Sequence, residues 1–352
     1  MAKRIAILGD TIVTGEIYGI QRFAYEILRQ IDMINPPMDI MLVVPSHANV
    51  KVSFNNITIV KYGWIKNSFL WRQLCFPNYA KKNGCISVDM TLGLPFHSCN
   101  IVCLHDCIYE NFSPDFVTIK EKIKRLNYLI RAKHSVKKSD KIITVSNNSK
   151  KELIEYYGVS EKKIEVVYNS WQHFERISSN YSVLSKLNLS PKGYYFSLGS
   201  GLRHKNILWV VNCAINNPSL QFVITGSDKF SGYLSSLGLA NIPNIMYTGY
   251  LPDEDVKALM ECCAAFIHPS FYEGFGIPPI EALSCGANII VSDSSCLPEI
   301  YGNSAVYINP NDDKVDMRDI DDFPDMEEKE KVLKKYSWQK SAEEFIKIME
   351  TI

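Results

Sequence analysis

Two glutamates, Glu273 and Glu281, bracket a glycine-containing turn in the stretch HPSFYEGFGIPPIEAL, which begins at His268. The apolar run from Ala264 to Ile267 predicts a buried parallel strand, and Pro278 predicts the first turn of a helix. A strand, a glycine turn and a helix start leave backbone N–H groups and the positive end of the helix dipole facing a ligand. This pattern favours a phosphate bound at the turn, with one carboxylate able to reach a group beyond the phosphate and the other to reach back toward a ribose.

The whole string PSFYEGFGIPPIEALSCG resembles the E-x7-E signature of retaining nucleotide-sugar glycosyltransferases of the GT-B fold, in glycosyltransferase family four. A glycine turn before a helix is common alone, so the specificity lies in the complete string. The resemblance implies that Glu273 bonds sugar hydroxyls and stabilises an oxocarbenium-like centre, and that Glu281 accepts from ribose hydroxyls. It also implies that the donor phosphates lie against the backbone of Gly274, Phe275, Gly276 and Ile277.

A second strand end, Tyr194 to Gly199, runs into the basic string SGLRHKN that ends at Asn206. Family members carry a Lys-Asn pair here whose lysine contacts the donor diphosphate, and Lys205 matches that lysine. The family's second basic residue stands one or five positions before the lysine, where this chain has His204 and Ser200. Arg203 stands two positions before the lysine and is therefore displaced by one. The resemblance therefore implies a catalytic Lys205 and leaves Arg203 as a donor-binding candidate. The Tyr250-Leu251 turn matches a family position near the nucleotide base.

Three further candidate residues lie at two places in the first half of the chain. The strand predicted from Ile101 ends in His105, at a strand end where open α/β sheets bind ligands. The family has a histidine here close to the donor sugar, so we expect a catalytic His105; a buried structural histidine is the alternative. Gly15 and Gly19 lie in the loop after the first strand, where the family has a phosphate-facing loop. There Gln21 replaces the family's second glycine, and a plain turn is the alternative.

Short strands alternate with helices along the 352 residues, which predicts an α/β protein with doubly wound, mostly parallel sheets and room for two domains. The resemblance implies the GT-B arrangement of two Rossmann-like domains facing each other across a cleft. We expect an N-terminal acceptor domain over 1–170, a linker over 171–192 and a nucleotide-sugar-binding domain over 193–336. The last helix, about 337–352, is expected to cross back onto the first domain.

The sequence does not favour a metal site. Asp253-Glu-Asp255 has the Asp-x-Asp form of some metal-dependent glycosyltransferases, but it follows Pro252 and precedes helical spacing, which favours N-capping and dipole compensation. The ten cysteines include no Cys-x-x-Cys pair, and those around His105 predict reduced, buried thiols rather than zinc ligands. We therefore expect no metal and no cofactor, with a UDP- or GDP-linked sugar as substrate.

The segment from Lys120 to Lys141 predicts an amphipathic helix with a basic face. Its nine basic residues stand against Glu121 and Asp140: Lys120, Lys122, Lys124, Arg125, Arg131, Lys133, Lys137, Lys138 and Lys141. Its apolar residues at helical spacing are Ile123, Leu126, Leu129, Ile130 and Val136. Solvated charge is one explanation, and attraction to an anionic membrane surface is the other. Since no apolar run approaches about 18 residues, we expect a cytoplasmic protein, peripheral on the inner face of the plasma membrane.

Together these features predict a retaining, metal-independent glycosyltransferase that acts on a glycan or polyprenyl-linked saccharide in capsule or O-antigen-type polysaccharide synthesis, with no nucleic-acid partner. No carboxylate can be assigned as a nucleophile on the far face of the sugar. Attack from the leaving-group side is therefore expected. Two alternatives remain open: a GT-B sugar-nucleotide epimerase and a catalytically inactive nucleotide-sugar-binding partner subunit.

Overall fold

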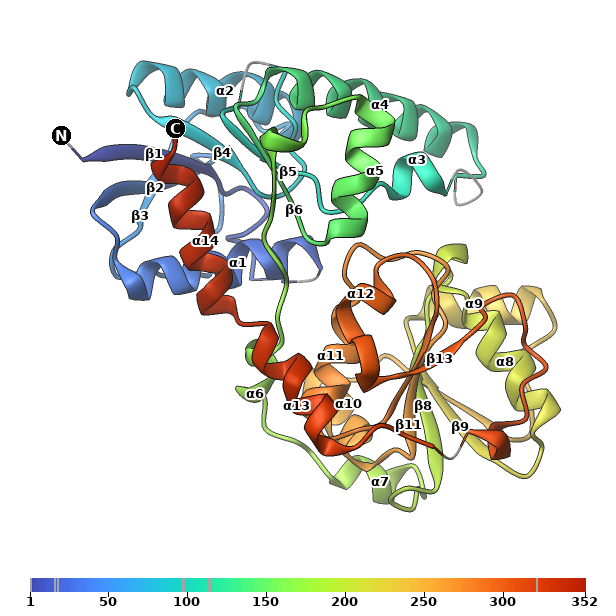
Figure 1. Cartoon of the computed structure of the whole chain (residues 1–352). Helices are drawn as coiled ribbons and strands as arrows, with labels where there is room; N and C mark the ends of the chain where they lie inside the picture. The colour runs from blue at the N-terminus through green and yellow to red at the C-terminus, as the bar shows by residue number, and fades with distance from the viewer. Residues whose placement is uncertain (1, 16, 18, 97–98, 113–115, 321) are drawn as a thin grey trace. The chain divides into compact units, whose positions relative to one another are not determined.

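The computed structural model describes residues 2–15, 17, 19–96, 99–112, 116–320 and 322–352, and its chain divides into two compact units (Figure 1). The first unit is Met1–Asn169 together with Trp338–Ile352, and the second is Ser170–Ser337. Each unit is a parallel sheet with helices on both faces. The predicted α/β class with two doubly wound, Rossmann-like sheets is confirmed.

The first sheet has the strand order β3-β2-β1-β4-β5-β6-β7. Its strands are β1 (Lys3–Leu8), β2 (Met38–Val44), β3 (Thr58–Lys61), β4 (Ile86–Asp89), β5 (Ile101–Cys103), β6 (Lys141–Thr144) and β7 (Ile164–Val166). Its helices are α1 (Ile20–Ile34), α2 (Ser68–Lys82), α3 (Ile108–Asn111), α4 (Ile119–Lys138), α5 (Asn147–Tyr157), η2 (Glu161–Lys163) and α14 (Trp338–Glu350). Helices α1 and α14 cover one face, and α2 and α4 cover the other (Figure 1).

The second sheet has the order β10-β9-β8-β11-β12-β13. Its strands are β8 (Tyr194–Leu198), β9 (Gln221–Thr225), β10 (Ile245–Gly249), β11 (Ala265–His268), β12 (Ile289–Ser292) and β13 (Val306–Ile308). Its longer helices are α8 (Ile207–Asn216), α9 (Asp228–Ser236), α10 (Asp253–Cys262), α11 (Ile277–Ser284) and α13 (Met326–Lys335). Its short helices are α6 (Gln172–Glu175), α7 (Ser182–Lys186), η3 (Arg203–Lys205), α12 (Leu297–Tyr301), η4 (Gly302–Ser304) and η5 (Met317–Asp319).

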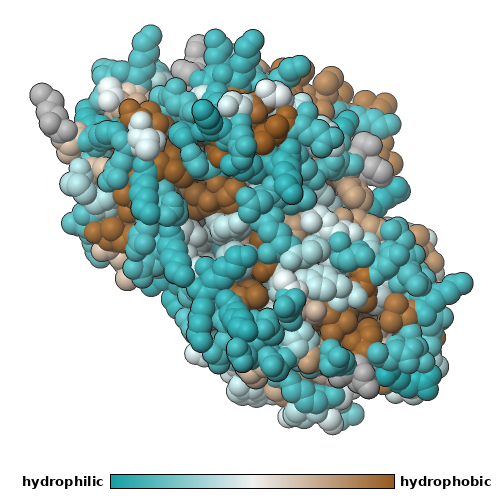
Figure 2. Space-filling view, in the orientation of Figure 1, coloured by the Kyte–Doolittle hydropathy of each residue, from teal (hydrophilic) through white to brown (hydrophobic). Residues whose placement is uncertain are grey.

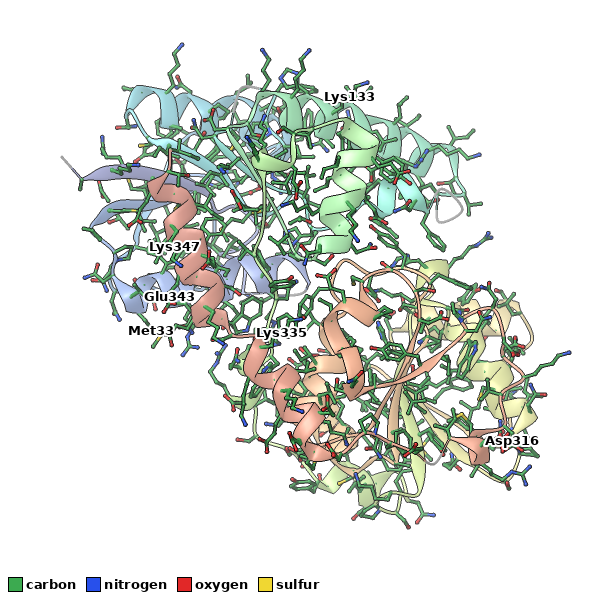
Figure 3. All side chains as sticks on the ribbon, viewed as in Figure 1. Met33, Lys133, Asp316, Lys335, Glu343 and Lys347 are labelled. Atoms are coloured by element: carbon green, nitrogen blue, oxygen red, sulfur yellow. The ribbon has the colours of Figure 1, made fainter. Side chains whose placement is uncertain are left out.

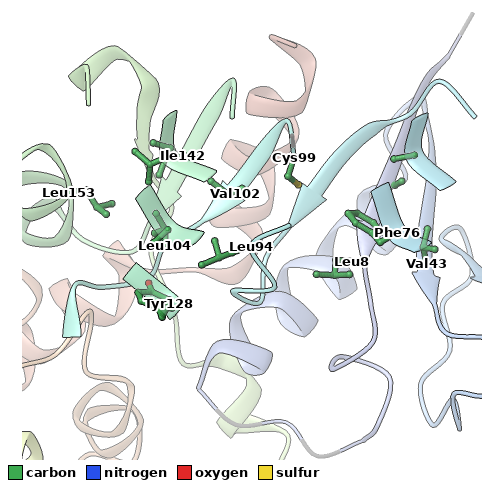
Figure 4. Close-up of a cluster of buried hydrophobic side chains, with 14 of the residues drawn as sticks. Leu8, Val43, Phe76, Leu94, Cys99, Val102, Leu104, Tyr128, Ile142 and Leu153 are labelled. Carbon is green, nitrogen blue, oxygen red and sulfur yellow. The ribbon is translucent and has the colours of Figure 1, made fainter. Parts of the chain in front are cut away.

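The strands of both sheets read as nearly continuous apolar runs because helices bury them on both faces. In the first unit, residues of the strands pack with Phe76 of α2 and Tyr128 of α4 in one buried cluster (Figure 4). The pairing of the two strands β1 and β2 is regular: Lys3 to Leu8 of β1 lie beside Met38 to Val43 of β2. The chain order reverses between β1 and β4, and in the second unit between β8 and β11. Ligands of doubly wound sheets bind at the carboxyl ends of strands at such reversals.

The segment 171–192, expected as a linker, is instead part of the second unit, where it forms α6 and α7. Hydrogen bonds with α10 hold it in place: Asn180 Nδ2 donates to Asp255 Oδ1 at 2.7 Å, and Lys257 Nζ of α10 donates to the Ile177 carbonyl at 2.8 Å. A composition rich in Ser and Asn predicts irregular backbone, but irregular backbone can still be packed.

Helix α14 belongs to the first unit, where it packs along α1. The ring of Trp338 lies 6.4 Å from that of Phe23, and Ser341 Oγ donates to the Tyr168 carbonyl at 2.7 Å. Within the described ranges, no helix is both long and apolar enough to cross a bilayer.

Candidate functional site at the carboxyl edge of the second sheet

The segments after β8 and β11 carry the main candidates. These two strands are parallel neighbours, with Ala265 beside Tyr195. Their carboxyl ends therefore lie at the same edge of the sheet, at the point where the strand order reverses. Lys205 follows β8 on η3, and Glu273 follows β11 in the turn before α11. The backbone joins the two segments, because Phe271 N donates to the His204 carbonyl at 2.8 Å.

Lys205 and Glu273 form a bidentate ion pair. Lys205 Nζ lies 2.8 Å from both Glu273 Oε1 and Glu273 Oε2. The Lys205 side chain is 29% exposed, whereas that of Glu273 is 9% exposed. An ammonium group has three N–H donors, so the pair leaves one for a ligand on the solvent side.

His268 completes this arrangement at the last position of β11. Its Nε2 lies 2.8 Å from Glu273 Oε1 and 3.1 Å from Ser270 Oγ. Ser295 fixes the backbone of the glutamate, since its Oγ donates to the Glu273 carbonyl at 2.7 Å. The sequence analysis assigned no role to His268. His268 stands at the end of an apolar strand, the same pattern from which His105 was predicted as a site residue. That pattern could have identified His268 as well.

The Glu273 carboxylate is held in its ionised form. Burial by itself would raise the pKa of Glu273, but the Lys205 ammonium and the hydrogen bond and charge of His268 hold that pKa well below its usual range. A carboxylate that stays ionised while desolvated is suited to stabilising a developing positive charge.

This ion pair should make stability depend on acid in a defined way. Because the folded-state pKa of Glu273 lies below the ordinary 4.5, its contribution is complete above that pH and is lost as pH falls toward the folded pKa. We expect the loss in unfolding free energy caused by Glu273→Gln to shrink as pH falls from about 6 to about 3. Denaturant titrations across this range measure it, with Glu175→Gln, an exposed site on α6, as control. A difference that stays constant with pH would contradict the ion pair.

The turn before α11 depends on Gly276. Its φ of 81° is in the left-handed region, and a Cβ there would lie 2.7 Å from Leu297 Cδ2. Two prolines, Pro278 and Pro279, have no N–H, so the helix start offers fewer donors than a normal first turn. The backbone N–H groups of Gly274, Gly276 and Ile277 donate to no residue in the described ranges. Three amide donors thus remain beside the ion pair for an anion.

Phe275 contributes to this turn in a different way. Its side chain is 2% exposed, and its ring packs edge-on against Tyr336 at 5.2 Å. A donor-binding role for this residue is therefore restricted to its backbone.

Glu281, in the second turn of α11, has a partner that the sequence analysis missed. Its Oε1 lies 2.7 Å from Nε2 of His173 on α6, and the His173 side chain is fully buried. His173 falls in the segment expected as a linker, 108 positions before Glu281, so no local pattern indicated it. The histidine orients the carboxylate while leaving it 15% exposed.

Three other donor-binding candidates belong to this unit. Arg203 is exposed at the start of η3, whereas Lys205 at its end reaches Glu273. Tyr250 and Leu251 follow β10, two strand positions from β8, and the Tyr250 side chain is exposed. They share the carboxyl edge of the sheet with Lys205.

His105, in the first unit, follows β5 and is buried. Its Nε2 lies 3.0 Å from the Met90 carbonyl, and its ring meets Phe23 edge-on at 4.9 Å. Since a carbonyl only accepts, Nε2 carries the proton, and burial lowers the pKa of His105 so that the ring is neutral. Nδ1 is then the ring nitrogen that can accept from a ligand. The contacts fit the structural alternative and do not remove the catalytic one.

Gly15 and Gly19, between β1 and α1, are both exposed and have positive φ, 81° and 46°. Gly19 is the N-cap residue of α1, and its carbonyl accepts from Phe23 N at 3.2 Å. Glu16 and Tyr18 of this loop lie outside the described residues. The loop follows β1 and so lies at the carboxyl edge of the first sheet.

The Asp253-Glu-Asp255 string is explained by α10, with one correction. All three acids lie in its first turn, where they compensate the dipole, but the N-cap is Pro252 and no side chain caps the helix. The prediction that these acids cap the helix was therefore wrong, because the first of them, Asp253, is already helical. Among the described residues, no group of three or more His, Cys, Asp or Glu could hold a metal ion. All ten cysteines are free thiols, and burial raises the pKa of Cys99, Cys103 and Cys107.

Two family models match the chain. Residues 185–340 match the family described as glycosyl transferases group 1, and residues 97–170 match glycosyltransferase family 4. Two similar curated proteins are the O-antigen chain mannosyltransferase RfbU of Salmonella typhimurium, 29% identical over 58% of this chain, and O-antigen chain mannosyltransferase B of Escherichia coli, 31% identical over 53%. The matched stretches span 57% and 52% of those two proteins, so the chain covers about half the length of each.

Solved structures resemble the whole chain in fold. Sucrose-phosphate synthase from Thermosynechococcus elongatus has a TM-score of 0.74 at 14% identity, covering 99% of this chain and 98% of its own. Anabaena HepE in complex with UDP and glucose has a TM-score of 0.69 at 13% identity, covering 99% and 100%. WaaG, a glycosyltransferase of lipopolysaccharide biosynthesis, has a TM-score of 0.61 at 13% identity, covering 97% and 94%.

Proposed function

On the premise that this chain has the GT-B fold and carries a glycosyltransferase family 4 domain over residues 97–170 and a group 1 domain over residues 185–340, we propose that it is a retaining glycosyltransferase. It moves a sugar from a nucleotide-sugar donor to a glycan or lipid-linked oligosaccharide of a surface polysaccharide. The two curated relatives are named as O-antigen mannosyltransferases, so a nucleotide-linked mannose is the first donor to test.

The observation that carries the proposal is the grouping of one ammonium, one ionised carboxylate and three unpaired amides at a strand-order reversal. Lys205 supplies the cation, Glu273 the carboxylate, and the start of α11 the amides. A diphosphate is the ligand that a cation and convergent backbone N–H groups bind together. A glycosyl group attached to it would lie beside Glu273, whose negative charge stabilises an oxocarbenium-like centre.

In the proposed reaction, the bond from the anomeric carbon to the donor phosphate breaks, and a bond to an acceptor hydroxyl forms on the same face. The electron pair of the broken bond stays on the phosphate, where Lys205 and the amides stabilise the new charge. The acceptor proton passes to that phosphate oxygen. Glu281, oriented by His173, accepts from the ribose hydroxyls.

The direct test is a panel of UDP-, GDP- and dTDP-linked sugars in thermal unfolding. A bound donor stabilises the folded state by RT ln(1 + [L]/Kd), so the cognate nucleotide gives the largest shift. We expect the same donor to be slowly hydrolysed, and to transfer its sugar with retention when acceptor is added. Interconversion of the donor sugar without acceptor would instead support the epimerase alternative, and donor binding without any turnover the inactive-subunit alternative.

The reaction should not need a divalent ion, because Lys205 and the amides supply the positive field that Mg²⁺ supplies elsewhere. We expect transfer rates to be unchanged when EDTA is added to protein and substrates. Addition of Mn²⁺ after dialysis should likewise leave the rate within about twofold, a change below about 0.4 kcal/mol. Activity that disappears with EDTA and returns with Mn²⁺ would show a metal-dependent mechanism.

A further inference from the structure

Helix α4 exposes apolar side chains on the side that faces away from the first sheet. The exposed fractions are 78% for Ile119, 63% for Ile123, 59% for Leu126 and 54% for Ile130. Their spacing of four, three and four places them on one side of the helix, a row called here the α4 ridge. The opposite side is buried through Tyr128, Ala132, Ser135 and Val136. A surface helix does not normally leave a row of branched aliphatic residues in water.

Lysines flank the α4 ridge on both sides. All of the following are exposed: Lys120, Lys122, Lys124, Lys133, Lys137 and Lys138. None of them forms an ion pair with a residue in the part of the chain that the structure describes. The one acidic residue of α4, Glu121, is used in the capping box with Thr118. Figure 3 shows Lys133 on the outer side of α4, and Figure 2 shows apolar and polar side chains mixed along this region.

Helix α2, which covers the same face of the sheet (Figure 1), also exposes apolar side chains. Leu70 and Leu74 of α2 are exposed, and so is Phe69, whose ring lies 5.6 Å from Arg131 Cζ of α4. The cation and ring connect the two helices. The face therefore combines exposed aliphatic and aromatic groups with a net positive charge.

We propose that the α4 ridge docks on the surface of an anionic lipid bilayer. The aliphatic side chains enter the boundary between headgroups and acyl chains, and the flanking lysines bind anionic headgroups. Charge alone would hold the protein above the surface, whereas the ridge inserts into it. The proposal rests on the proposed function only for its purpose, which is delivery to a lipid-linked acceptor; the docking itself needs no transfer reaction.

Charge complementarity favours a bilayer over the other occupants of such a face. A second copy related by a two-fold axis would bring the same patch against itself and so place lysines opposite lysines. A nucleic acid would use the lysines but would leave the aliphatic ridge in water. An anionic bilayer is the partner that satisfies both features at once.

The test is sedimentation with vesicles of phosphatidylcholine, with and without phosphatidylglycerol. The full chain should bind phosphatidylglycerol vesicles at least about tenfold more strongly than pure phosphatidylcholine at low salt. In about 1 M salt, where the Debye length is about 3 Å, the lysine contribution is screened and a residual binding from the ridge should remain.

Three double variants separate the contributions. Ile123→Gln with Leu126→Gln should weaken binding at least about tenfold and abolish the part that resists salt. Lys133→Gln with Lys137→Gln should weaken binding at low salt but leave the salt-resistant part. Ile215→Gln with Leu237→Gln, which are 46% exposed in the second unit, should bind like the unmodified chain. Equal donor-induced thermal shifts in all variants would confirm that folding and nucleotide binding are intact.

The proposal is overturned if the ridge variant binds vesicles as well as the control variant does, or if the unmodified chain binds neither kind of vesicle. It is also overturned if sedimentation velocity shows a dimer that the ridge variant alone dissociates, since the ridge then contacts a second copy. These outcomes are independent of transfer activity, so a failed docking proposal leaves the proposed function standing, and the reverse also holds.

Discussion

Replacing Lys205 with alanine should lower kcat by about 10²–10³-fold, the loss that accompanies removal of one preorganised group stabilising transition-state charge. The ammonium lies 2.8 Å from both Glu273 oxygens and has a third N–H for the donor phosphate. Negative charge on that phosphate grows as the glycosidic bond breaks, so the lysine acts more strongly on the transition state than on the bound donor. KM for the donor should therefore rise much less than kcat falls, in steady-state assays of transfer.

The control is Lys192→Ala in the same unit. Lys192 lies before the amino end of β8, and its Nζ donates to the Cys263 carbonyl at 2.9 Å, away from the carboxyl edge. It should retain kcat. A Lys205→Ala variant with unchanged kcat and a raised donor KM would assign the lysine to ground-state binding only.

The pairing of Lys205 with Glu273 predicts non-additive effects. Removal of the lysine leaves Glu273 buried with only the hydrogen bond to His268 beside it, so the pKa of Glu273 should rise and the carboxylate should stabilise positive charge less well. In a Glu273→Gln background, Lys205→Ala should therefore cost less than it does alone. Residues in direct contact commonly show such coupling.

The position of this site was predictable from local patterns. Apolar runs that end in glycine turns predicted β8 and β11 as buried strands, and parallel neighbours present their carboxyl ends at one edge. The family resemblance assigned Lys205 to the donor diphosphate and Glu273 to the donor sugar, so the two were expected at one site. The bidentate geometry was not predictable, because it depends on how η3 and the turn before α11 are joined by the bond from Phe271 N to the His204 carbonyl.

Partners that come from distant segments escaped the sequence analysis. His173 contacts Glu281 only because α6 packs against α11 within the second unit, and its own neighbourhood in the sequence predicts irregular backbone. A linker was predicted there from the absence of periodicity. Side chains such as Asn180, which bonds Asp255, give that segment an order that periodicity does not report.

Helix α4 shows a second limit of periodicity. The apolar set predicted from the sequence places Ile123, Leu126 and Ile130 at helical spacing, but these three are exposed and the buried side is centred on Tyr128 and Ala132. A helix with apolar residues on two sides has two possible buried faces. The packing of the sheet decides between them, and the face left outside is the one that the docking proposal uses.

Replacing Glu281 with glutamine should weaken donor binding about tenfold or more while changing kcat by less than about threefold, because a charged hydrogen bond to a bound ligand is worth about 1.5–3 kcal/mol. The change keeps the shape of the side chain, and its amide oxygen can still accept from His173, so the turn of α11 should stay intact. The bond to the ribose is the same before and during glycosyl transfer, and such uniform binding affects affinity rather than turnover.

Calorimetric titration of the donor measures the affinity, and transfer at saturating donor measures kcat. Glu261→Gln is the matched control. Glu261 lies on α10, where its carboxylate accepts from Tyr181 Oη at 2.6 Å. It has no assigned role in donor binding, so the donor affinity of this variant should be unchanged. The pattern expected for Glu281 is opposite to that for Lys205, which affects turnover and spares affinity. If Glu281→Gln lowered kcat and left affinity intact, this glutamate would act on the reacting centre rather than on the bound nucleotide, and the roles assigned here to Glu281 and Lys205 would not differ.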